Sequence, residues 1–139
     1  NFTLNYLLSM GATKSKLYPG IPFYGQAYRL SSPFRHQLGD PASGPGMPGE
    51  FTQQPGMLGY YEICDNIKHK KWEIGEGPSA HFKDQFVSYD DVRTVFDKGT
   101  WIRQNGFGGA TAWTVDLDDF INRCCLESFP LLRSLNRGL

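Results

Sequence analysis

The spacing of apolar positions along the chain predicts three helices. Residues 2–10 place apolar side chains near helical spacing, and residues 130–137 do the same at the other end of the sequence. The helix predicted most clearly spans residues 90–104, and Ser88 or Asp90 is expected to cap its N-terminus. Its apolar face consists of Val92, Val95, Phe96 and Ile102.

Between these helices the pattern predicts strands and a long irregular insertion. Residues 17–28 form an apolar and aromatic run entered through a turn, and residues 108–115 form a second strand of mostly small residues. Residues 31–59 are rich in Gly, Pro and Ser, which excludes a long regular element there. Residues 59–68 fit a strand or a short helix, and residues 71–86 fit short strands. This order of elements favours the α/β class.

Composition narrows the possible partners. The chain has 139 residues, enough for one domain with a modest core, and its formal net charge is zero. Without a basic field, nucleic acid and anionic membranes are not expected as partners. No stretch reaches the roughly 18 apolar residues of a membrane span. The three histidines lack the spacing of metal ligands, and no glycine-rich segment has phosphate-binding form, so neither a metal nor a cofactor is expected.

The cysteines leave two interpretations open. Cys64 is far along the chain from the adjacent pair Cys124 and Cys125. One long-range disulfide with a remaining thiol would fit a secreted protein, whereas three reduced buried thiols would fit a cytosolic one. The triplet that starts at Asn1 matches the N-glycosylation sequon, which weakly favours secretion.

The candidate chemistry is concentrated in residues 108–120. Small residues lead into Trp113, and the carboxylates of Asp116, Asp118 and Asp119 follow. Trp113 offers a flat apolar face on which a sugar ring can stack, although the residue also fits an ordinary core position. For the carboxylates we favour a structural interpretation, in which they cap the last helix and pair with nearby basic residues.

Three segments together resemble the C-terminal part of family 18 glycoside hydrolases, the family of chitinases and chitinase-like lectins. They are residues 18–25 (YPGIPFYG), residues 51–64 (FTQQPGMLGYYEIC) and residues 108–120 (GGATAWTVDLDDF). The stretch after residue 120 looks most like arthropod chitinases.

This resemblance implies strands seven and eight of a (β/α)8 TIM barrel, with flanking helices and an inserted small α+β subdomain. Residues 1–29 and 89–139 would be barrel segments, and residues 30–88 the chitinase insertion subdomain. Because a complete barrel typically needs about 250 residues, the remainder of the barrel is expected upstream of Asn1.

The resemblance also implies an extracellular protein that binds chitin or chitooligosaccharides. Family members hydrolyse β-1,4-linked N-acetylglucosamine with assistance from the substrate's own acetamido group, an exception to the two-carboxylate scheme. Their catalytic Glu ends an Asp-x-x-Asp-x-Asp-x-Glu stretch, which this chain lacks. The parent is therefore predicted to be a chitinase and the isolated chain inactive. A lectin that has lost the acid is the alternative, and an unrelated carbohydrate-binding domain is a weaker one.

The side chains that the resemblance assigns to the sugar-binding cleft are Trp113, Tyr24, Gln26, Met57, Gln54 and Tyr61. Trp113 would form the floor under the sugar, and the Tyr24 hydroxyl would face it. Gln26 stands where Arg is common, so this position keeps hydrogen bonding and loses a charge. At least one of Tyr60 and Tyr61 is expected in the subdomain core instead of the cleft.

The family pattern implies a disulfide between Cys64 and a cysteine shortly after Phe120, which would tie the subdomain to the barrel. Cys125 fits the family spacing better than Cys124, so the predicted pair is Cys64 with Cys125.

Overall fold

The computed structural model describes residues 2–124 and 126–139, and it has mixed α/β content, as predicted. Its helices are α1 (Phe2–Ser9), α2 (Tyr60–His69), α3 (Val92–Gln104) and α4 (Pro130–Gly138), with short 3-10 turns η1 (Lys14–Lys16) and η2 (Val115–Leu117). Its strands are β1 (Gly20–Pro22), β2 (Tyr24–Leu30), β3 (Ala42–Pro45), β4 (Met57–Gly59), β5 (Glu73–Ile74), β6 (Ser79–Phe82), β7 (Gln85–Ser88) and β8 (Thr111–Trp113). Within the described ranges, no helix has both the length and the apolar character required to span a membrane.

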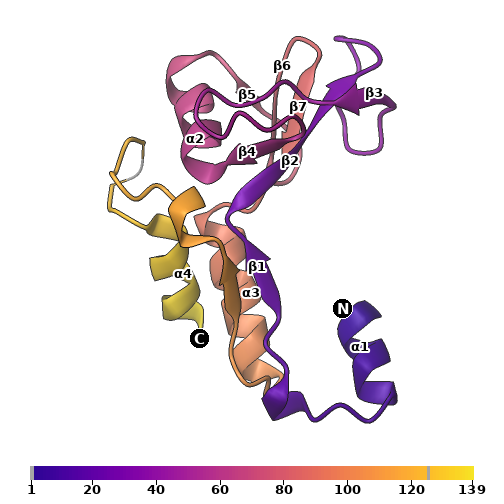
Figure 1. Ribbon diagram of the computed structural model, residues 1–139, viewed down its shortest axis with the longest axis vertical. Helices are drawn as coiled ribbons and strands as arrows, with labels where there is room; N and C mark the ends of the chain where they lie inside the picture. Colours follow the sequence, from indigo (N-terminus) through magenta and orange to yellow (C-terminus); the bar gives the residue numbers. More distant parts are fainter. Residues whose placement is uncertain (1, 125) are drawn as a thin grey trace.

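One part of the molecule is a parallel strand pair with two helices beside it (Figure 1). Strands β1 and β8 pair with Ile21 opposite Ala112. Helices α3 and α4 pack closely, and Gly99 lies at their contact, where an added Cβ would come within 2.9 Å of the Leu135 carbonyl oxygen. The glycine that interrupts the apolar face of α3 therefore permits this close approach. The buried core here comprises Ile21, Phe23, Tyr60, Val95, Ile102, Leu131 and Leu135.

The other part is an antiparallel sheet in the order β3-β2-β7-β6-β5, with β4 also paired to β2. Helix α2 lies against this sheet (Figure 1). At Gly25 an added Cβ would meet the side chains of Val87 and Ile63 at 2.5 and 2.7 Å, so glycine is required where α2 and β7 approach β2. A second buried cluster fills this contact and comprises Ala27, Leu58, Ile63, Ala80 and Val87.

The predicted strand at residues 17–28 is in fact two strands that serve different sheets. It divides at Phe23, whose N–H donates to the Trp113 carbonyl oxygen at 2.8 Å. The chain leaves β1, which pairs with β8, and continues as β2 in the antiparallel sheet (Figure 1). Residues placed at the end of β8 and along β2 are consequently neighbours.

The cap of α3 differs from the predicted one. Asp91 is the N-cap, and its side chain accepts from the Thr94 N–H at 2.8 Å. Asp90 is engaged elsewhere, because both of its carboxylate oxygens accept from Lys98 Nζ at 2.6 and 2.8 Å. Ser88 is the last residue of β7 and is paired in the sheet.

Candidate functional site

A cavity of about 780 Å³ lies along β2, next to the end of β8. Three stretches of chain line it besides β2 itself, namely β3, the turn that enters β4, and the segment from β8 into η2. The lining residues are Tyr24, Gln26, Ala27, Tyr28, Ala42, Gly44, Pro45, Gln54, Pro55, Gly56, Met57, Trp113 and Leu117. None of these side chains carries a charge, so the cavity suits a neutral ligand that offers hydroxyl and amide groups.

Trp113 stands at the end of β8 with 65% of its surface exposed, which excludes a core position within the described chain. Its main chain is held in place, because its carbonyl oxygen accepts from the Phe23 N–H and the residue pairs with Pro22 across the parallel ladder. The peptide bond to Thr114 is cis. A flat indole is thus presented to the cavity from an anchored backbone.

The outward face of β2 forms one wall of the cavity. Tyr24, Gln26 and Tyr28 alternate along this strand and line the cavity, whereas the intervening Gly25 and Ala27 are buried. This is the two-residue period of a strand with one covered face. Tyr28 was not among the cleft residues predicted from the sequence, although the alternation that begins at Tyr24 would have indicated it.

The turn into β4 extends this wall beside β2. Met57 pairs directly with Gln26 across the β2–β4 ladder, and Gln54 lies three residues before it. The Gly56 carbonyl oxygen accepts from the Ala27 N–H at 2.9 Å, which attaches this turn to β2. The structure therefore brings together five of the six predicted cleft residues: Trp113, Tyr24, Gln26, Gln54 and Met57.

The sixth predicted residue, Tyr61, does not line this cavity. Its ring makes edge contacts with Phe51 and Phe120, each with ring centroids 6.0 Å apart, and burial raises the pKa of its hydroxyl. Tyr60 belongs to the buried core, as expected for at least one of the pair. Successive helical residues point in different directions, so the first turn of α2 places Tyr60 in the core and Tyr61 against these two phenylalanines.

Glu62 holds the cavity-lining turn in place. This role was also not predicted from the sequence. Only 4% of its surface is exposed. Its Oε1 accepts from the N–H groups of Phe51 and Thr52 at 2.7 and 3.0 Å, and its Oε2 accepts from Thr52 Oγ1 and the Gly59 N–H at 2.8 and 3.0 Å. A Glu at the third position of a helix is the capping-box pattern, which was the available signal. The carboxylate clamps both ends of the segment that carries Gln54 and Met57.

We expect Glu62→Ala to lower the free energy of unfolding by about 3 kcal/mol, since it leaves several partly buried donors without an acceptor. Urea unfolding of the complete protein measures this. Glu50→Ala is the matched control, because Glu50 is an exposed carboxylate that forms an ion pair with Lys70 at 2.9 Å, and such pairs contribute about 0–1 kcal/mol. Equal losses for the two variants would contradict the clamp.

Asp118 bears out the helix-capping part of the structural interpretation of the carboxylates that follow Trp113. It is fully buried and accepts from the N–H groups of Leu131 and Leu132 at 3.2 and 2.9 Å, so it caps α4 from outside the helix. The helix's own N-cap residue, Phe129, provides no side-chain bond. Burial raises the pKa of Asp118, and its backbone donors oppose this shift.

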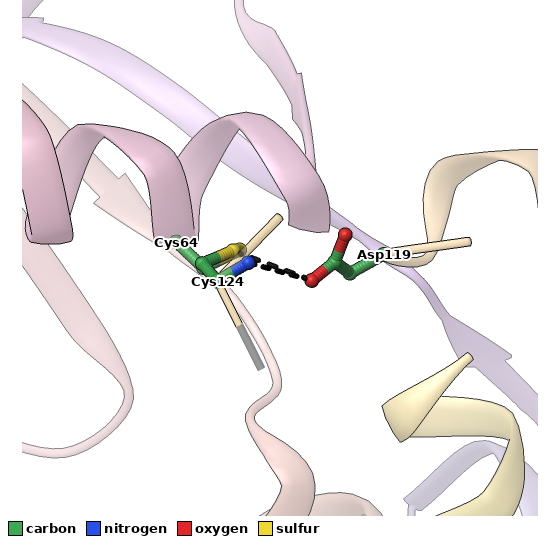
Figure 2. Close-up of side chains that lie close together, drawn as sticks. All are labelled: Cys64, Asp119 and Cys124. Carbon is green, nitrogen blue, oxygen red and sulfur yellow. Dashed lines mark hydrogen bonds between the residues drawn. A yellow bond between two sulfur atoms is a disulfide. The ribbon is translucent and has the colours of Figure 1, made fainter. Parts of the chain in front are cut away.

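Asp119 organises the next turn and the disulfide beside it (Figure 2). Its carboxylate accepts from the N–H groups of Arg123 and Cys124 at 2.8 and 3.0 Å. Cys64 of α2 is bonded to Cys124, with their Cα atoms 5.9 Å apart. The Asp119 carboxylate thus holds the backbone on either side of the Arg123–Cys124 peptide bond, next to the disulfide.

The predicted partner of Cys64, Cys125, is therefore corrected to Cys124. Cys125 itself lies outside the described residues. Cys64, Asp119 and Cys124 are close enough to share a metal ion. The thiolate is the form of cysteine that binds metals, and here the two sulfurs are bonded to each other, so this cluster is a covalent link between α2 and the turn after η2.

The fold and the cavity define an α/β protein with an open, uncharged cleft that has aromatic residues on its floor and wall. The sequence model described as glycosyl hydrolases family 18 matches residues 1–118. The chain belongs to this family, which confirms the resemblance.

Among curated relatives, probable chitinase 10 of Drosophila melanogaster is 47% identical over 145 residues, covering 100% of this chain and 6% of the relative. Chitotriosidase-1 of Mus musculus is 40% identical over 133 residues, covering 95% of this chain and 29% of the relative. The similarity to the insect protein agrees with the arthropod-type pattern. This chain thus spans well under half the length of either relative.

Solved structures show the same likeness. Catalytic domain 2 of the Ostrinia furnacalis group II chitinase matches with a TM-score of 0.95 and 38% identity, covering 100% of this chain and 38% of that one. Human YKL-39, described as a pseudo-chitinase with retained chitooligosaccharide binding, matches with a TM-score of 0.89 and 35% identity, covering 97% of this chain and 38% of that one.

Proposed function

We propose that this chain is the C-terminal part of a secreted chitinase that hydrolyses β-1,4-linked N-acetylglucosamine polymers by the substrate-assisted retaining mechanism. Its role is to supply the floor and one wall of the substrate cleft. The observation that carries this proposal is the exposed Trp113, which stands at a strand end beside the polar and aromatic face of β2.

Each lining group has a defined role in this proposal. The Trp113 indole stacks on the apolar face of the sugar at the cleavage point and keeps its ring in position. The Tyr24 hydroxyl and the Gln26 and Gln54 amides hydrogen-bond to hydroxyl and acetamido groups, and Met57 adds an adaptable apolar contact. No cavity-lining residue is an acid, so the proton donor comes from the segment of the protein upstream of Asn1.

The architecture supports this placement. Strands β1 and β8 are parallel neighbours with α3 and α4 beside them (Figure 1), as strands seven and eight of a (β/α)8 barrel would be. We assign residues 1–29 and 89–139 to the barrel and residues 30–88 to an inserted α+β subdomain. The disulfide fits an extracellular location, where such bonds persist.

A chitinase-like lectin is the second candidate, because YKL-39 is described as binding chitooligosaccharides without being a chitinase. The complete protein and residues 1–139 alone should each be assayed for chitooligosaccharide cleavage and binding. We expect cleavage by the complete protein and none by the isolated chain. Binding without cleavage by the complete protein would identify the lectin, and cleavage by residues 1–139 would overturn the placement of the acid upstream.

A further inference from the structure

We propose that Tyr28 forms an additional sugar-stacking position at the end of the cleft remote from Trp113, so that the protein distinguishes long chitooligosaccharides from short ones. This inference rests on the proposed function and deepens it.

The distance along β2 places Tyr28 beyond the sugar at the cleavage point. Tyr24 and Tyr28 lie on the same face of the strand, four residues apart. At about 3.3 Å per residue their Cα atoms are about 13 Å apart, which exceeds the length of one pyranose ring. The cavity is continuous from Trp113 to Tyr28, so an oligosaccharide stacked on Trp113 reaches Tyr28 only if it has further units.

The surroundings of Tyr28 leave its ring accessible. The neighbouring lining residues at this end of the cavity have no long side chain: they are Ala42, Gly44, Pro45, Pro55 and Gly56. Tyr28 itself is 42% exposed. Its cross-strand partners are Pro45 in β3 and Phe86 in β7. Pro45 has a short ring, Phe86 is itself buried, and Tyr28 keeps its exposed surface between them. The result is a flat platform at the end of an open groove.

The backbone around the platform is held by a chain of hydrogen bonds. The Gly46 N–H donates to the Ala27 carbonyl oxygen at 2.9 Å, and the Gly56 N–H donates to the Gly46 carbonyl oxygen at 3.0 Å. An added Cβ at Gly46 would lie 2.8 Å from the Ala27 Cβ, so these segments are in direct contact. A preorganised aromatic surface binds a ligand without the cost of ordering a loop.

The chemistry of the platform fits a neutral sugar. A tyrosine provides an apolar face for the ring C–H groups and a hydroxyl for hydrogen bonding. Arg29 and Asp84 are close to each other, at 3.6 Å, but neither lines the cavity. The extra position is therefore uncharged like the other lining residues of this cavity, which suits a neutral N-acetylglucosamine unit.

The test uses the complete protein with its upstream acid replaced, so that ligands are not cleaved. Calorimetry gives the Kd of chitooligosaccharides from the disaccharide to the hexasaccharide for Tyr28→Ala, Tyr28→Leu and Tyr28→Phe. Tyr28→Ala and Tyr28→Leu should weaken binding of the longest ligands about tenfold, a typical loss for an aromatic contact, and leave the shortest unchanged. Tyr28→Phe should retain most of the affinity because the ring remains.

Phe34→Ala is the matched control, since Phe34 is 89% exposed after the end of β2 and does not line the cavity. It should bind every ligand as the unaltered protein does. Equal weakening at all lengths, unchanged affinity at all lengths, or full affinity in Tyr28→Leu would each overturn the inference. If the unaltered protein bound none of these ligands, the proposed function would be overturned with it, which separates the two failures.

Discussion

Trp113→Ala is expected to weaken chitooligosaccharide binding by the complete protein about a thousandfold, or about 4 kcal/mol. The indole is the largest apolar surface in the cavity and is presented by a backbone that the β1–β8 pairing holds in place. Its loss removes the floor against which the neighbouring hydrogen bonds orient the sugar. Calorimetric titration of ligands of every length measures the effect, which should not depend on length.

The fold should survive this substitution. Trp113 is 65% exposed and belongs to neither buried cluster, so its removal creates no cavity in the core. We expect the thermal unfolding midpoint to change little. Trp113→Phe, which keeps a smaller flat ring, should bind with intermediate affinity. An unchanged Kd in Trp113→Ala would show that this residue is not the floor of the sugar site.

Removal of the disulfide should give the largest loss of stability. The bond joins residues separated by 60 positions. In the chain-entropy account, closing a loop of that size lowers the entropy of the unfolded chain by the equivalent of about 4 kcal/mol. Cys64→Ser and Cys124→Ser should each lower the free energy of unfolding by about this amount, as measured by urea denaturation without reductant.

Cys125→Ser is the matched control because it replaces a cysteine next to the bonded one. It should unfold at the urea concentration of the unaltered protein. A large loss in Cys125→Ser, together with unchanged stability in Cys124→Ser, would contradict the observed pairing. Addition of reductant should remove the difference between the unaltered protein and the two bond-deficient variants.

The sequence by itself determined the elements whose signals are local. The apolar spacing of α3 and α4 and the small residues that precede Trp113 located these segments, because helical and strand periods are properties of neighbouring residues. The family motifs likewise predicted five residues that the structure gathers around one cavity. These motifs also indicated the family, which the comparisons confirm.

Only the tertiary structure decided which groups meet across the chain. Local pattern allowed Asp90 as a helix cap, and the family spacing favoured Cys125 as the disulfide partner. In the structure the Lys98 ammonium donates to the Asp90 carboxylate, and the Cys124 N–H donates to the Asp119 carboxylate. These pairings depend on which groups lie close together in the folded chain. Spacing along the sequence does not specify those distances.

The same reason explains the residues that could not be identified from the sequence. Glu62 gains its role from N–H groups of residues 51 and 52, which are ten or more positions away. Tyr28 lines the cavity because the cavity follows the length of β2, whereas the Tyr61 ring makes edge contacts with Phe51 and Phe120 outside it. Residue types and periods are local properties, whereas a cleft is formed by surfaces that only folding brings together.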